Sequence, residues 1–194
     1  MKHFIYFSPR ASTSGKALSQ GNLMKAGRID IAIHSFIQAV YLSEDFRDDV
    51  TFHFVFYGMP DPPKHIQITV TPELGLNKRD IGKILQKALY KYKPRIKNEV
   101  FPQIFIEKKN LFKVIEELQE QGKEIFILDR RGESLRKAKI PKEPVFLIGD
   151  QKGLPKIELK KLKKIATKIS IGPKTYFASQ VVAIVNNELD FRNI

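Results

Sequence analysis

The chain of 194 residues contains no cysteine and no tryptophan. Without cysteine it has no disulfide bond, no zinc site built on thiolates and no cysteine nucleophile. It has four histidines, and their spacing matches no metal-binding motif, so we expect no metal. They are His3, His34, His53 and His65. A protein without disulfides is typical of an intracellular compartment, and we expect a cytoplasmic location.

Long apolar runs are also missing. No stretch approaches the roughly 20 apolar residues of a membrane span, and the apolar part of MKHFIYFSPR at residues 1–10 is too short for a signal peptide. We therefore expect a soluble protein with no membrane partner. The length fits a single domain, 1–194, that can bury a core without cross-links.

Three common motifs are absent as well. No GxGxxG follows a strand, and neither GxxxxGK[ST] nor GxSxG occurs. These absences argue against a Rossmann dinucleotide site, a Walker-type NTPase and a serine hydrolase.

Acidic residues are outnumbered by basic ones, 21 to 34, which gives a net charge of +13. Residues 123–168 alone carry 14 basic and 6 acidic side chains, so more than half of the excess lies in less than a quarter of the chain. A concentrated basic surface attracts a polyanion, and nucleic acid is the commonest one. A lysine-rich solvated surface is the alternative explanation.

The apolar pattern predicts strands and helices in mixed order. Strands are expected at 3–7, 50–58, 65–70, 100–108, 124–129, 144–150 and 168–173, and helices at about 29–41, 80–93, 110–122, 157–168 and 175–190. The polar segment 11–28 reads as a long loop, either functional or disordered. The last three strands lack polar alternation, which is typical of a parallel sheet covered on both faces in an α/β fold.

Three polar loops follow these last three strands: LDRRGESL, GDQKGLP and GPKTYFAS. Open parallel sheets bind ligands at the carboxyl ends of their strands, so we expect the loops to converge on one pocket. Glycine in such a loop lets a ligand lie against main-chain groups. The final helix is apolar on more than one side, which indicates that it is buried or meets a partner chain.

Two further motifs carry candidate functional side chains. In GMPDPPKH, residues 58–65, three prolines fix the chain around Asp61, a candidate base or hydrogen-bond acceptor. The alternative is a turn in which Asp61 caps its own backbone. In KAGRIDIAI, Arg28 could bind a phosphate and Asp30 could favour a helix dipole, although an ion pair at the helix start explains both equally well.

Taken together, FLIGDQKGLP, ISIGPKTYFASQVVAIVNNELD, KAGRID and GMPDPPK resemble the archaeal tRNA pseudouridine-54 N1-methyltransferase family, which belongs to the SPOUT superfamily. The resemblance covers nearly the whole chain. It implies an α/β fold with a mostly parallel sheet, helices on both faces and a C-terminal deep trefoil knot in about 124–190. It also implies S-adenosylmethionine as cofactor, tRNA as substrate and a homodimer.

The resemblance also assigns residues. The implied cofactor site comprises Leu128, Asp129, Gly132, Ile148, Gly149, Asp150, Gly153, Leu154, Ile171, Gly172, Thr175, Tyr176 and Ala178. The implied substrate site comprises Arg28, Asp30, Asp61, Arg130 and Arg131, with Asp61 as the catalytic carboxylate. Tyr176 or Phe177 could stack on a target base turned out of its RNA arm, although both residue types are more often part of a core.

One position departs from the resembled family, whose members often carry cysteine where this chain has Val181. The chemistry does not need the thiol, because N1 of pseudouridine is a ring N–H that can attack a sulfonium methyl directly once its proton is accepted. Two alternatives stay open. One is a pseudouridine N1-methyltransferase acting on small-subunit ribosomal RNA, and the other is a basic RNA-binding protein without catalysis.

Overall fold

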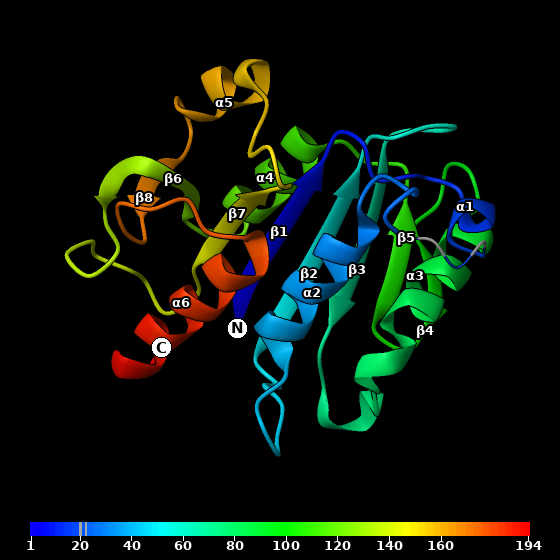
Figure 1. Cartoon of the computed structure of the whole chain (residues 1–194), viewed down its shortest axis with the longest axis horizontal. Helices are drawn as coiled ribbons and strands as arrows, with labels where there is room; N and C mark the ends of the chain where they lie inside the picture. The colour runs from blue at the N-terminus through cyan, green and yellow to red at the C-terminus, as the bar shows by residue number, and fades with distance from the viewer. Residues whose placement is uncertain (20, 22) are drawn as a thin grey trace.

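The chain forms one eight-stranded sheet with helices on both faces, as the computed structural model of residues 1–19, 21 and 23–194 describes it (Figure 1). The strands are β1 (Lys2–Ser8), β2 (Val50–Phe56), β3 (Lys64–Thr69), β4 (Asn98–Phe101), β5 (Ile104–Glu107), β6 (Ile125–Ser134), β7 (Val145–Gly149) and β8 (Thr167–Ser170). The helices are α1 (Gly15–Ser19), α2 (Ile29–Val40), α3 (Ile81–Tyr90), α4 (Leu111–Glu120), α5 (Lys156–Leu162) and α6 (Ala178–Phe191), with 3-10 turns at Pro72–Leu74 and Lys78–Asp80.

The strand order is β4-β5-β3-β2-β1-β7-β6-β8. The five strands from β2 to β8 in this order run parallel to one another. At the other end, β3 runs antiparallel to β2 and β5, and β4 runs antiparallel to β5. The mostly parallel sheet predicted from the apolar strands is thus confirmed.

Two apolar layers flank the sheet. Alternate residues of β1 point to opposite faces, so Phe4 and Tyr6 pack in the layer with α2, α3 and α6, whereas Ile5 and Phe7 pack in the layer with α4 and Leu162 of α5. Every residue of β1 is buried. A strand covered on both faces needs no polar alternation, which explains the continuous apolar runs in the sequence. Within the described residues, no helix has the length and apolarity to span a membrane.

Several predicted boundaries were wrong. The single strand predicted at 100–108 is the hairpin β4–β5, which turns at Pro102 and Gln103, where Gln103 has a left-handed φ of 61°. β6 does not end at 129 but continues to Ser134, pairing with β8 on both sides of a register shift. The predicted loop 11–28 contains α1, and its positions 20 and 22 lie outside the described residues. α6 begins at Ala178, three residues after the predicted start.

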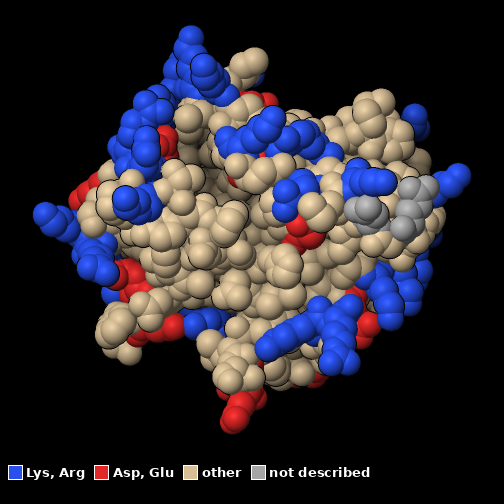
Figure 2. Space-filling view, in the orientation of Figure 1, with Lys and Arg blue, Asp and Glu red and all other residues tan. Residues whose placement is uncertain are grey.

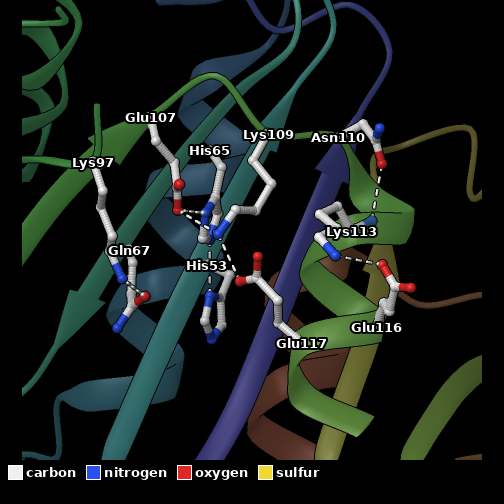
Figure 3. A network of polar contacts seen from close by, with 10 residues as sticks. All are labelled: His53, His65, Gln67, Lys97, Glu107, Lys109, Asn110, Lys113, Glu116 and Glu117. Atoms are coloured by element: carbon white, nitrogen blue, oxygen red, sulfur yellow. Dashed lines mark hydrogen bonds and ion pairs between the residues drawn. The ribbon is translucent and has the colours of Figure 1, made fainter. Parts of the chain in front are cut away.

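Three buried histidines, His3, His53 and His65, form a hydrogen-bonded chain across the sheet on the α4 face. Figure 3 shows His53 and His65 with the carboxylate of Glu107 at the end of this chain. Nδ1 of His3 lies 3.1 Å from Nε2 of His53, and Nδ1 of His53 lies 2.9 Å from Nε2 of His65. Nδ1 of His65 lies 3.1 Å from the carboxylate of Glu107, which also pairs with Lys109 at 2.8 Å. A carboxylate only accepts, so each neutral ring carries its proton on Nδ1 and the chain has one orientation.

Burial lowers the pKa of all three histidines, to about 4 for His3. Burial alone would raise the pKa of Glu107, but hydrogen bonds from His65 and Lys109 hold it at about 2. At neutral pH the chain therefore contains three neutral imidazoles ending on an ionised carboxylate.

Candidate active site

A cavity of about 430 Å³ lies at the carboxyl ends of β7 and β8, beside the middle of β6 and the start of α6. Its volume is in the range that protein pockets use for small organic ligands. Apolar side chains line much of it: Ile31, Leu128, Ile148, Ile169, Ile171 and Val181. Lysine and arginine side chains gather along the upper edge of the molecule in the view of Figure 2, which is the edge where these strands end. The cavity is therefore apolar inside and set in a basic edge.

The three segments predicted as loops do meet at one cavity, but only those after β7 and β8 are loops, since the first, predicted over 128–135, lies within β6 up to Ser134. Leu128–Arg130, Ile148–Gly153 and Ile171–Ala178 all contribute to the cavity. Of the thirteen residues predicted for the cofactor site, Gly132 and Leu154 lie outside its lining and the other eleven are part of it. Whether the eleven contact a cofactor stays a prediction.

The glycines have a different structural reason from the one expected. A Cβ on Gly149 would lie 2.3 Å from the carbonyl carbon of Gly153 and 2.5 Å from the Leu154 nitrogen. Gly149 therefore allows its own loop to fold back on itself, and Gly153 supplies the left-handed turn with a φ of 74°. Leu154 packs in the apolar layer of α4 instead of facing the cavity.

Gly132 allows β6 and β8 to approach each other closely next to the cavity. A Cβ there would lie 2.5 Å from the carbonyl carbon of Lys168 and from the nitrogen of Ile169, both in β8. The close approach lets β6 bend around β8, so Gly132 shapes the wall of the cavity from outside it.

Two carboxylates fix the cavity loops. The Asp150 side chain is only 1% exposed and accepts hydrogen bonds from Ser8 Oγ at 3.2 Å, Arg10 Nη2 at 2.9 Å and the Lys152 amide at 2.8 Å. Asp129 accepts from Lys168 and from the amide of Arg131. Burial alone would raise the pKa of Asp129, but these hydrogen bonds bring it below its ordinary value. Both carboxylates can accept further bonds from ligand hydroxyls.

Arg28 and Asp30 lie beside the cavity and bind each other. Nε of Arg28 is 3.0 Å from one Asp30 oxygen, and Nη2 is 2.9 Å from the other. Arg28 has a left-handed φ of 64°, and Ile31, directly after Asp30, lines the cavity. The pair thus has the ion-pair geometry considered for the helix start. Of the predicted substrate arginines, Arg130 lines the cavity, whereas Arg131 is 82% exposed outside it.

Asp61 lies at the same edge of the sheet but is not part of the cavity lining. Its carboxylate binds Lys64 Nζ at 2.6 Å and also Lys108, and hydrogen bonds from Lys108 and Lys64 lower its pKa. The side chain is 49% exposed. Asp61 is thus an ionised, accessible acceptor. Its carboxylate binds two lysines and does not cap its own backbone, contrary to the alternative interpretation of this motif.

A loop that no sequence motif had marked joins these two sites. Residues 8–13 follow β1, and Cβ atoms on Gly27 and Gly58 would lie 1.9 Å and 2.4 Å from the Arg10 carbonyl oxygen. Thr13 Oγ1 donates to the Gly58 carbonyl at 2.8 Å and accepts from the Asp61 amide at 2.9 Å. A signal for it exists in the sequence, because SPRAS directly follows a strand. The lining residues Ile31, Ile169, Gln180 and Val181 have no such signal, since they belong to regular helices and strands.

The comparisons with known proteins agree with this geometry. All 194 residues match the model of a family described as "Putative SAM-dependent RNA methyltransferase". The chain is 31% identical over 200 residues to "Putative pseudouridine methyltransferase" of Vibrio campbellii, with 99% of each chain covered. It is 30% identical over 198 residues to tRNA (pseudouridine(54)-N(1))-methyltransferase of Methanococcoides burtonii, with 100% of this chain and 98% of that one covered.

A solved structure shares the fold over its full length. The crystal structure of Archaeoglobus fulgidus Nep1 bound to S-adenosylhomocysteine superposes with a TM-score of 0.65 at 14% identity, covering 100% of both chains. With the family model matched from the first residue to the last, the chain belongs to the family of S-adenosylmethionine-dependent RNA methyltransferases.

Proposed function

We propose that this enzyme transfers the methyl group of S-adenosylmethionine to N1 of pseudouridine at position 54 of tRNA. The observation that carries the proposal is the full-length similarity to relatives with that name, 30% identical over 98% or more of both chains. A basic edge around the cavity supports an RNA substrate. An enzyme acting on tRNA would work in the cytoplasm.

The lining residues fit the cofactor. Leu128, Ile148 and Ile171 offer an apolar surface for an adenine ring, and the ionised Asp129 can accept hydrogen bonds from ribose hydroxyls. The bend of Gly149–Gly153 brings main-chain groups to the same space. When bound there, S-adenosylmethionine supplies a methyl group on a positively charged sulfur.

A trefoil knot in about 124–190 is part of the proposal. Ile169 of β8 pairs with both Leu128 and Glu133 of β6, so β6 bends around β8. The Leu135 amide donates to the Ser170 carbonyl at 2.8 Å, and Arg192, just after α6, donates to the carbonyls of Leu135 and Ala138 at 2.6 and 2.7 Å. These contacts support a loop that encloses the segment leading into α6.

Asp61 is the proposed proton acceptor. A pseudouridine N1 that has received a methyl group while still carrying its proton is strongly acidic, so a carboxylate with a lowered pKa is basic enough to take the proton. Asp61 is half exposed, so it would meet the base at the rim, outside the lining of the cavity. Arg28 and Asp30 would hold the same nucleotide from the side of α2.

We expect Asp61→Asn to lower kcat at least 100-fold, because an amide cannot accept the N1 proton. The dissociation constant for S-adenosylmethionine should change less than twofold, since Asp61 does not line the cavity. Single-turnover methylation and calorimetry measure the two quantities. Asp61→Glu should recover part of the rate, and an unimpaired rate in Asp61→Asn would remove Asp61 from the mechanism.

Val181 gives a second test of the cavity. Because its side chain lines the space, we expect Val181→Phe to weaken cofactor binding at least tenfold by occupying part of it. Val181→Cys, which keeps a small side chain, should bind the cofactor within threefold of the parent chain. Equal affinities for Val181→Phe and the parent chain would place the cofactor elsewhere.

We further propose a homodimer that pairs through α6. Phe177 and Phe191, at the two ends of this helix, are 73% and 80% exposed, which is unusual for large apolar side chains. Light scattering on a size-exclusion column measures the mass of the assembly, and a monomer at micromolar concentration would contradict the pairing.

The choice of RNA is tested by incubating the enzyme and cofactor with tRNA and, separately, with small-subunit ribosomal RNA. Mass spectrometry of the nucleosides should find N1-methylpseudouridine in the tRNA alone. Methylation of the ribosomal RNA alone would favour the alternative substrate, and binding of RNA without any methylation would favour the non-catalytic alternative.

A further inference from the structure

A short basic and aromatic segment lies between α3 and β4, and the function proposed above does not use it. Residues 90–97 read YKYKPRIK, with four basic side chains and no acidic one. We call this segment the 90–97 turn. Lys91, Lys93, Arg95 and Lys97 are all exposed, and Tyr90, the last residue of α3, is 58% exposed. Basic and aromatic residues alternating on a surface are typical of nucleic-acid contacts.

The 90–97 turn lies at the same edge of the sheet as the cavity. β5 runs in the direction of the parallel strands because two antiparallel pairings separate it from β2. β4 runs against β5, so the start of β4 and the turn before it lie where the parallel strands end (Figure 1). Five strand spacings separate β5 from β6 in the sheet, a distance of roughly 24 Å. The turn is thus at the same edge as the cavity and far from it, but it lies beside Asp61, because the ring centre of Tyr92 is 3.7 Å from Nζ of Lys64, which pairs with the Asp61 carboxylate.

Its positive charge is not compensated. Within the described residues, none of its four basic side chains forms an ion pair with an acidic one. Instead, Lys91 lies 5.1 Å from the ring centre of Phe101, and Lys97 lies 4.7 Å from that of Phe105. A surface that only keeps a protein soluble usually carries both basic and acidic side chains. This turn carries basic side chains alone, and two of its lysines pack on aromatic rings.

The backbone of the turn is also unusual. Arg95 has a left-handed φ of 66°, a conformation that costs an ordinary side chain free energy and is commonly given to glycine or asparagine. An arginine at this position presents a guanidinium group on the exposed surface of the turn. Arginine and lysine are the side chains that contact phosphate oxygens most often.

We propose that the 90–97 turn binds backbone phosphates of the RNA substrate, on the side of Asp61 that faces away from the cavity. The inference rests on the proposed function for the identity of the RNA. Contacts to phosphates position a nucleic acid without reading its sequence. The four basic side chains of the turn would therefore contribute to the affinity for folded tRNA. Since none of these four residues, all of which the structure describes, pairs with Asp61, the chemical step and cofactor binding should be unchanged.

The test is a variant with Lys91, Lys93, Arg95 and Lys97 all changed to glutamine. We expect its KM for tRNA to rise at least tenfold, with kcat at saturating tRNA and the dissociation constant of S-adenosylmethionine within twofold. The slope of log Kd for tRNA against log salt concentration should fall by about 3, because four phosphate contacts contribute roughly 0.7 to 0.9 each.

A matched control removes the same charge elsewhere. Lys78, Arg79 and Lys83 lie at the start of α3, at the opposite edge, and Lys113 lies on α4 on the other face. Changing these four to glutamine should alter the salt slope by less than about 1. If both quadruple variants lower the salt slope equally, the effect comes from net charge and not from the turn. If the 90–97 variant leaves the slope unchanged, the turn does not contact the RNA. Either result overturns the proposal.

The experiments distinguish failure of the proposed function from failure of the proposed role of the 90–97 turn. If the parent chain binds tRNA but methylates nothing, the methyltransferase assignment to tRNA falls, while the difference in salt slope between the two variants still decides the role of the turn. If the parent chain does not bind tRNA at all, the turn has no RNA to hold and the inference is overturned.

Discussion

The substitution Gly149→Ala should lower the affinity for S-adenosylmethionine at least 100-fold while the sheet remains folded. The added Cβ would lie 2.3 Å from the carbonyl carbon of Gly153, and backbone cannot move aside as a flexible side chain can. The loop Gly149–Gly153 would have to open, and with it one wall of the cavity. A 100-fold loss corresponds to about 2.7 kcal/mol of binding free energy. Calorimetry with S-adenosylmethionine measures it directly.

The matched control is Gly82→Ala in α3. There the added Cβ would meet the side chain of Ile33 at 3.5 Å, an ordinary contact, and alanine favours a helix over glycine by roughly 0.5–1 kcal/mol. Gly82→Ala should therefore bind the cofactor normally and unfold at a slightly higher temperature. Normal affinity in Gly149→Ala would show that the cofactor does not depend on this loop.

The free energy of unfolding should fall steeply as the pH drops from 6.5 to 5. In the folded chain His3, His53 and His65 have lowered pKa values, about 4 for His3, whereas in the unfolded chain each titrates near 6.5. Below pH 6.5 the histidines bind protons in the unfolded state but stay neutral in the folded state. The stability that these neutral histidines contribute is therefore fully present above pH 6.5 and is lost as the pH falls. His3 alone should lose about 2 kcal/mol between pH 6.5 and 5, and the other two add to it.

Urea unfolding at a series of pH values measures this loss. His53→Leu removes the central member of the chain and should flatten the curve between pH 6.5 and 5. His34→Gln, which changes an exposed histidine on α2, should leave the curve as it is. Glu107 titrates near 2 and does not contribute in this window. A stability that is constant from pH 7.5 to 5 would contradict the buried neutral chain.

The parallel part of the fold could be predicted from the sequence because strands that are buried on both faces are continuous apolar runs. β1, β6 and β7 each contain an apolar run, and the loop after β7 is recognisable by its glycine and aspartate residues. The converging loops follow from strand direction alone, so the position of the cavity and most of its lining could be predicted from the order of the strands.

The errors have physical reasons. The hairpin β4–β5 looked continuous because the turn at Gln103 contains no glycine, although its φ is 61°. β6 was ended early because its second half is polar and exposed, and it is held as a strand only by pairing with β8. The histidine chain joins residues up to 104 positions apart on four strands, so no local pattern announces it.

Asp61 was singled out correctly as a carboxylate held just beyond the end of β2, but the sequence could not reveal its partners. Lys64 is three residues away in sequence, whereas Lys108 comes from the end of β5, which strand order brings beside it. The 90–97 turn was missed for another reason. The largest excess of basic residues, at 123–168, lies elsewhere in the chain, and four basic residues in a short segment do not stand out beside it.

The most direct test of the account is methyl transfer to tRNA that differs at one position. Two transcripts of the same tRNA, one with pseudouridine and one with uridine at position 54, are incubated with the enzyme and methyl-labelled S-adenosylmethionine. We predict one methyl group per molecule on N1 of the pseudouridine and none on the uridine transcript, because uridine is joined to its ribose through N1 and has no N–H there. Equal labelling of both transcripts, or labelling at another nucleotide, would contradict the account.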